Sequence, residues 1–258
     1  MTRHVILKLL TVTVVFLGLN FCDSLYGETG PNKKIKVAVI YTGSSPQLIA
    51  DTEGEIMKQL GPNVEILRYK EPGILDDTLK AGYVTPKGAA RLITVYMNAI
   101  DSGADAILSV CSTVGDAAYS MQDAAKFLGV PIIIINEEMC REAVRKGNRI
   151  AIMATLPSSI APTKNIINRV SREMGKHVEV TEVCLDGGYG SEPDKLKALM
   201  ASKAVEIVDK VDVIVFSQGS MAYCEEYLVK TYNKTVLSNP RFGAAAVKTA
   251  LIAKGYEF

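Results

Sequence analysis

The chain has 258 residues, of which 48% are hydrophobic and 22% charged, as is typical of a folded globular protein. Lys and Arg number 29 against 28 Asp and Glu, so the basic excess expected of a nucleic-acid-binding protein is absent. Five cysteines are too few for a scaffold built on disulfides. With only two histidines, His4 and His177, we expect no multi-histidine metal site and no histidine-based triad.

Residues 1–27 differ in composition from the rest of the chain. A basic start that includes Arg3 and Lys8 precedes an apolar run over 9–19, which is shorter than the about 20 residues that span a bilayer. This pattern predicts a secretory signal peptide, with an uncleaved membrane anchor as the alternative. We therefore expect an exported protein, periplasmic or secreted, that contacts a membrane only through this segment.

Apolar, β-branched runs alternate with helical patterns after Pro31. The predicted strands are 35–41, 64–69, 106–110, 131–135, 150–154, 178–184 and 211–216. The main predicted helices are 46–60, 86–100, 114–128, 157–174, 192–210 and 220–232, three of which begin at a proline. Apolar strands separated by helices predict an α/β fold with parallel sheets covered on both faces.

The two halves of the chain resemble each other. The run 36–42 matches 149–155, and 104–111 matches 211–218, in the same order. The pairing sets Cys111 against Gln218. Local patterns that all βαβ proteins share are the alternative explanation. A duplication predicts two pseudo-symmetric, Rossmann-like lobes, 35–145 with 238–258 and 146–237, with the active site in the cleft between them.

Cys111 comes directly after a buried strand and opens a helical segment. The unpaired N–H groups at a helix start favour the thiolate, which is the reactive form of cysteine. Ser112 and Thr113 add hydroxyl groups at the same turn. Position alone also fits a small buried apolar residue. The other cysteines of the body, Cys140, Cys184 and Cys224, are expected to be packing residues.

Turns rich in hydroxyl groups follow three further predicted strands, 35–41, 150–154 and 211–216. Helix starts with hydroxyl groups suit a carboxylate ligand, and two such turns around one cleft favour a ligand site over simple helix capping. Gln218 is an uncharged donor and acceptor and cannot act as a general base. The loop 186–190 is glycine-rich and able to cover the cleft. The turn residues in question are Thr42, Ser44, Ser45, Thr155, Ser158, Gln218, Gly219 and Ser220.

These motifs together resemble the Asp/Glu/hydantoin racemase superfamily over roughly residues 35–250. The resemblance rests on Cys111-Ser-Thr-Val-Gly115, on Ala154-Thr-Leu-Pro-Ser158 and on Phe216-Ser-Gln-Gly-Ser-Met221. It implies cofactor-independent chemistry on a small carbon acid, such as an amino acid or a hydantoin. A cysteine from each lobe serves one face of the substrate in the family racemases, and Cys111 matches the first of them. The resemblance also places Thr42, Ser44, Ser45, Thr155, Ser158 and Ser220 at the substrate.

The chain departs from the family pattern at one position, because Gln218 stands where the second cysteine is expected. Single-cysteine relatives in the superfamily include decarboxylases and enzymes that isomerise a double bond. A single-cysteine site suits one-face proton transfer, decarboxylation with reprotonation, or nucleophilic addition by Cys111, with Gln218 holding the substrate. A non-catalytic exported solute-binding protein and a catalytically inactive relative with an interaction role are the alternatives. No cofactor, metal or nucleic acid is implied, and a homo-oligomer is left open.

Overall fold

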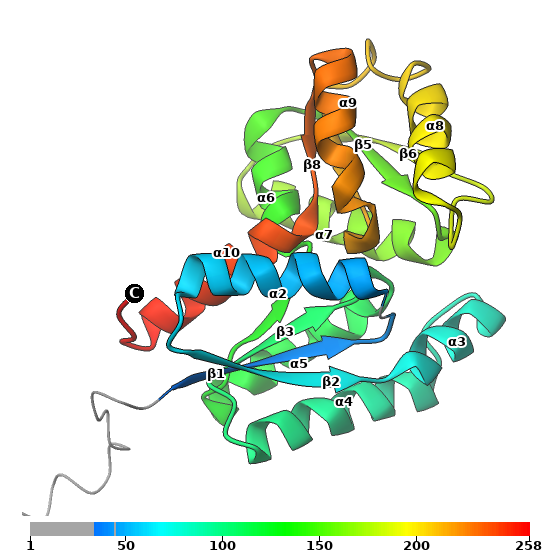
Figure 1. The fold of residues 1–258 in the computed structure, drawn as a ribbon. Coiled ribbons are helices and arrows are strands. Elements are labelled where there is room, and N and C mark those ends of the chain that lie inside the picture. The colour runs from blue at the N-terminus through cyan, green and yellow to red at the C-terminus, as the bar shows by residue number, and fades with distance from the viewer. Residues whose placement is uncertain (1–33, 44) are drawn as a thin grey trace, which may run out of the picture. The chain divides into compact units, whose positions relative to one another are not determined.

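The computed structural model describes residues 34–43 and 45–258 (Figure 1). The predicted leader over 1–27 and the candidate Ser44 lie outside the described residues. Within the described part of the chain, no helix has the length and apolar character needed to cross a membrane.

Two four-stranded parallel sheets form the framework. The first consists of β1 (Ile35–Tyr41), β2 (Val64–Lys70), β3 (Ala106–Val110) and β4 (Ile132–Ile134), in the order β2-β1-β3-β4. The second consists of β5 (Arg149–Ala154), β6 (Glu179–Cys184), β7 (Val213–Phe216) and β8 (Thr235–Leu237), in the order β6-β5-β7-β8. The strand order is the same in both sheets, which confirms the predicted α/β fold with two pseudo-symmetric lobes.

Helices connect the strands, as βαβ units require. Three of the predicted helices begin with a short 3₁₀ turn. The α-helices are α2 (Pro46–Leu60), α3 (Pro72–Ala81), α4 (Pro86–Asp101), α5 (Gly115–Leu128), α6 (Glu137–Lys146), α7 (Ile160–Glu173), α8 (Pro193–Ala204), α9 (Glu225–Tyr232) and α10 (Asn239–Ala253). The 3₁₀ turns are η1 (Ser112–Val114), η2 (Pro157–Ser159) and η3 (Gly219–Cys224).

An aspartate occupies the same position in each sheet. Asp105 Oδ2 accepts from the backbone N–H of Lys36 at 2.8 Å, and Asp212 Oδ2 accepts from that of Arg149 at 2.9 Å. The backbone N–H of each aspartate returns a bond of 2.7 Å to the carbonyl of the same basic residue. The internal resemblance of the sequence therefore corresponds to a repeated local structure, in which the carboxylate ties two neighbouring strands at their starts.

The two sheets share buried contacts. The largest buried cluster contains Ile107 from β3 and Ile152 from β5, and both side chains are fully buried. The chain leaves the second sheet after β8, and α10 then packs on α2, α6 and β3 (Figure 1). The predicted lobe boundaries at 145 and 237 stay a prediction.

Candidate active site

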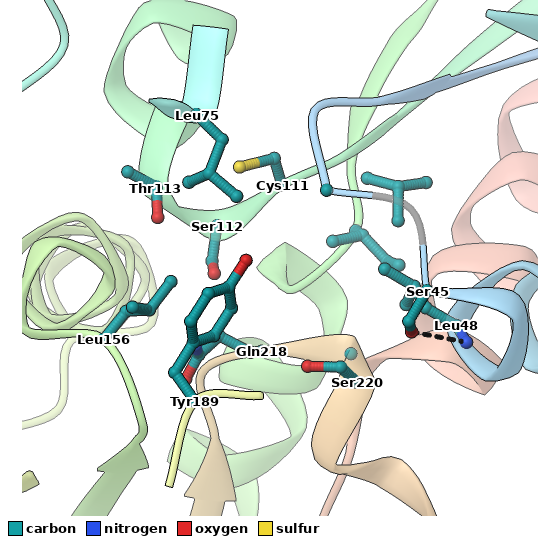
Figure 2. Close-up of a pocket in the computed structure, with 14 residues that line it drawn as sticks. Ser45, Leu48, Leu75, Cys111, Ser112, Thr113, Leu156, Tyr189, Gln218 and Ser220 are labelled. Carbon is teal, nitrogen blue, oxygen red and sulfur yellow. Dashed lines mark hydrogen bonds between the residues drawn. The ribbon is translucent and has the colours of Figure 1, made fainter. Parts of the chain in front are cut away.

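A small pocket lies where β1, β3 and β7 end. Its volume is about 100 Å³, and it takes residues from both halves of the chain (Figure 2). Parallel α/β sheets bind ligands at the carboxyl ends of their strands, so the position agrees with that rule. The lining residues are Gly43, Ser45, Leu48, Leu75, Val110, Cys111, Ser112, Thr113, Ile135, Leu156, Tyr189, Gln218, Gly219 and Ser220.

Three helical segments begin at this pocket. Ser45 is the N-cap of α2, Cys111 of η1 and Gln218 of η3. The N–H groups in the first turn of a helix have no partner within that helix, and they carry the positive end of its dipole. Among the described residues that line the pocket there is no Asp, Glu, Lys, Arg or His. A carboxylate in this pocket would therefore be held by backbone N–H groups and hydroxyls, without a cationic side chain.

Cys111 is half-buried and its thiol is free. It follows β3 directly, and its backbone is extended, with φ −163° and ψ 110°. Its side chain also packs against the buried cluster that contains Tyr96 and Val114. Cys111 is the one cysteine among the residues that line the pocket.

The other described cysteines, Cys140, Cys184 and Cys224, are also free thiols. Cys140 and Cys224 are fully buried. Burial raises the pKa of Cys140 far above its ordinary value and that of Cys224 to about 11. Burial and the neighbouring Asp186 carboxyl raise the pKa of Cys184. These three environments disfavour the thiolate.

Gln218 lines the pocket, but its side chain is bound to Thr155. The amide Oε1 accepts from the Thr155 backbone N–H at 2.7 Å, and Nε2 donates to the Thr155 hydroxyl at 2.8 Å. Both residues are buried. The sequence predicts that the Gln218 side chain holds the substrate. In the structure its amide is bonded to Thr155, and only one amide N–H is left to donate to a ligand.

The pocket brings together most of the predicted site residues. They are Ser45, Cys111, Ser112, Thr113, Gln218, Gly219 and Ser220. The Ser45 hydroxyl is already engaged, since it caps α2 by accepting from the Leu48 N–H at 3.2 Å.

Three predicted residues do not line this pocket. Thr42 is buried, and its hydroxyl has no hydrogen-bond partner among the described residues. Thr155 lies behind Gln218, to which it is bonded. Ser158 lines a neighbouring pocket that shares Thr113 with the first one, and its buried hydroxyl also lacks a partner within the described part of the chain. Each follows a strand as predicted, but the direction of the side chain was not predictable from that position.

The structure adds lining residues that the sequence does not predict as site residues. Five of them are aliphatic side chains, namely Leu48, Leu75, Val110, Ile135 and Leu156. Figure 2 shows Leu48, Leu75 and Leu156 on different sides of the pocket. Tyr189 belongs to the glycine-rich loop 186–190, and its hydroxyl points into the pocket (Figure 2). The sequence pointed to Tyr189 only indirectly, because it lies in a glycine-rich loop that is able to cover the cleft.

The loop that carries Tyr189 depends on its glycines. Gly187 and Gly190 have φ angles of 74° and 70°, in the left-handed region that favours glycine. A Cβ at Gly188 would lie 2.9 Å from both Thr155 Cγ2 and the Leu185 carbonyl oxygen. The loop can therefore pack closely against Thr155, beside the pocket.

Within the described residues, no three His, Cys, Asp or Glu side chains gather as a metal site would require.

Comparisons with known proteins identify one family by sequence and a shared fold by structure. The sequence profile described as Asp/Glu/Hydantoin racemase matches residues 47–247. The chain is similar to a glutamate racemase from Bacillus anthracis, with a TM-score of 0.66 and 16% identity over 87% of this chain and 84% of that one. An allantoin racemase from Klebsiella pneumoniae gives a TM-score of 0.62 and 19% identity over 86% and 89%.

A double mutant of arylmalonate decarboxylase in its liganded form is also similar. It gives a TM-score of 0.54 and 15% identity over 83% of this chain and 92% of that one. A search of the curated proteins finds no match. At these identities the solved structures show a shared fold, and the profile match shows the family.

Proposed function

The chain belongs to the Asp/Glu/hydantoin racemase family, a family of isomerase-type enzymes, and from that premise we propose that it transfers a proton at the carbon next to a carboxylate. The substrate is a small carbon acid, either a carboxylate such as an amino acid, or a hydantoin or related compound, in which a ring carbonyl takes the place of the carboxylate. Cys111 is the acid/base residue. The observation that carries this proposal is a free thiol at a helix start, inside a pocket whose lining has no charged side chain.

The chemistry follows from the geometry of the pocket. The Cys111 thiolate takes the α-proton, so the C–H bond breaks, an S–H bond forms, and the electron pair moves onto the carboxylate. The helix starts at Ser112 and Gly219 present N–H groups to that growing charge. Preorganised donors of this kind stabilise developing charge more effectively than water does.

Decarboxylation with reprotonation is the second candidate reaction. It is favoured by the aliphatic side chains that line the same pocket as Cys111, including Leu75 and Ile135, because apolar surroundings destabilise a carboxylate placed against them. The similarity in fold to arylmalonate decarboxylase is consistent with this reaction. One thiol is enough for it, since a single proton is returned to the carbon.

Hydrogen–deuterium exchange at the α-carbon tests the proposal. Amino acids, 5-substituted hydantoins and malonates are incubated with the protein in D2O, and exchange and loss of CO2 are followed by NMR. Cys111→Ala is expected to lower the rate by at least ~100-fold, the lower end of general acid–base contributions. The matched control is Cys184→Ala, because Cys184 is half-buried but does not line the pocket.

Several results would count against this function. Equal rates in wild type and Cys111→Ala would remove the thiol from the mechanism. Binding of an acid without exchange or decarboxylation would favour the solute-binding alternative. That protein would release its ligand unchanged and would need no reactive thiol.

Export is a separate part of the proposal. It rests on the basic start and short apolar run within residues 1–27, which lie outside the described residues. Expression of the full chain, cell fractionation and N-terminal sequencing test it. Recovery of the protein outside the cytoplasm with a new N-terminus near Ser24 or Gly27 is expected. A cytoplasmic protein that retains Met1 would contradict export.

A further inference from the structure

Two of the fourteen lining residues carry an acid/base group other than an aliphatic hydroxyl or an amide. They are Cys111 and Tyr189. The remaining lining side chains are aliphatic, hydroxyl or amide groups, apart from the glycines. Thiols and phenols are among the groups that enzymes use for general acid–base catalysis. Among the described lining side chains, Tyr189 is therefore the strongest acid besides Cys111, because a phenol gives up its proton far more readily than an aliphatic hydroxyl.

The two residues reach the pocket from opposite halves of the chain. Cys111 follows β3 of the first sheet, whereas Tyr189 follows β6 of the second. In Figure 2 the tyrosine hydroxyl points toward Cys111 and Ser112 across the pocket. A small acid bound between them would present one face of its α-carbon to the thiol and the other to the phenol.

Gln218 cannot supply the second proton. It stands at the position of the second family cysteine, but a neutral amide is not an acid/base group at ordinary pH. Its amide is also bonded to Thr155 at 2.7 and 2.8 Å. Tyr189 is held beside the same pair, because Gly188 packs against Thr155.

We propose that Tyr189 is the acid/base residue for the face of the substrate opposite Cys111. This inference rests on the proposed function. Cys111 removes the α-proton as described, and the Tyr189 O–H bond then breaks as a C–H bond forms on the opposite face. The products are the inverted substrate, a Cys111 thiol and a Tyr189 phenolate.

The enzyme then has to return to its starting state. The thiol gives its proton to solvent, and solvent protonates the phenolate, so charge and protons balance over the cycle. Tyr189 is 51% exposed as a whole residue, so it lies at the edge of the pocket, where solvent can supply the proton that resets it. In the reverse direction the phenolate takes the proton and the thiol returns it.

Tyr189→Phe tests the proposal, because it removes the hydroxyl and keeps the ring. The acid that exchanges fastest is assayed in D2O as each separate enantiomer. Chiral chromatography follows inversion and mass spectrometry follows deuterium uptake. We expect the rate of inversion to fall by about 100-fold. For the enantiomer whose α-proton faces Cys111, deuterium uptake with retention of configuration should fall by less than tenfold. Tyr227→Phe is the control, since that exposed tyrosine lies on α9 and does not line the pocket.

The outcomes separate this inference from the proposed function. Unchanged inversion in Tyr189→Phe would overturn the role of Tyr189 and leave Cys111 in place. Equal loss of inversion and exchange would show that Tyr189 only positions the substrate, and would also overturn the proposal. Absence of exchange in wild type with every acid would overturn the proposed function and this inference with it.

Discussion

Cys111 and Gln218 show how one backbone position can carry two kinds of chemistry. Both residues are in an extended conformation after a buried strand, and both are the N-cap of a 3₁₀ turn. The thiol of Cys111 is free, whereas the amide of Gln218 bridges the backbone N–H and hydroxyl of Thr155. In the second half, the side chain that follows the strand therefore joins two neighbouring turns.

The bridge between Gln218 and Thr155 is expected to contribute to stability. Gln218→Leu leaves the buried Thr155 N–H without its partner, and should lower the free energy of unfolding by about 1–3 kcal/mol. Thr155→Val removes only the bond to the hydroxyl and should cost less. Urea denaturation of both variants and of the double variant measures the coupling. Additive effects would contradict a direct interaction between the two side chains.

The residues of the site were only partly predictable from the sequence. The turns after the strands can be read from apolar runs that end in polar residues, and this reading located Cys111, Thr113 and Ser220. The direction of Ser158, which faces a neighbouring pocket, depends on how η2 packs. Leu75 lines the pocket from α3. No helix was predicted there, so nothing in the sequence indicated that Leu75 belongs to the site.

At the scale of elements, continuous apolar runs and a helix that begins at a proline were predicted with the observed bounds, whereas the amphipathic helix α6 and the C-terminal elements were missed. β1, β3 and α2 have the predicted bounds. β8 has only three residues, and α10 is rich in alanine, so neither shows a clear hydrophobic period. The position of α10 is set by close packing against the first sheet. At Gly243 the helix lies so near Ile135 that a Cβ there would be 2.9 Å from Ile135 Cγ1.

The aspartate that ties β5 to β7 predicts a pH-dependent stability. The Arg149 guanidinium and the N–H groups of Arg149 and Asn148 lower the pKa of Asp212 to about 2. Because the folded pKa lies below the ordinary value of 3.8, the stabilisation is present above about pH 4 and is lost as pH falls toward 2.

Asp212→Asn should therefore lower the Tm by a constant amount above about pH 5, and the difference from wild type should shrink between pH 4 and 2. Thermal unfolding followed by circular dichroism across this range is the measurement. The exposed Asp209, three residues earlier, provides the control variant Asp209→Asn. A difference in Tm that does not change with pH would assign the effect to the lost geometry and not to the charge.

At the scale of the whole molecule, a buried polar cluster joins the two halves. Asn136, at the start of α6, donates to the Thr163 hydroxyl at 3.1 Å, and that hydroxyl lies 2.8 Å from the Ser217 hydroxyl. Asn239, at the start of α10, donates to the Ser217 carbonyl at 3.1 Å. The side-chain oxygens of both asparagines find no partner among the described residues. Buried polar groups have to keep the bonds they make, so the cluster restricts how the halves pack.

Thr163 is the centre of this cluster, because its hydroxyl also bonds to the Ser159 carbonyl at 2.8 Å. Thr163→Val keeps the shape of the side chain but leaves Asn136 and Ser217 short of a partner. The free energy of unfolding should fall by about 1–3 kcal/mol, and the Tm by roughly 3–10 °C. Thr231→Val is the matched control, since the exposed Thr231 bonds only to the Tyr227 carbonyl, and should change stability by less than about 0.5 kcal/mol. Equal effects of the two variants in calorimetry would show that the buried cluster does not hold the halves together.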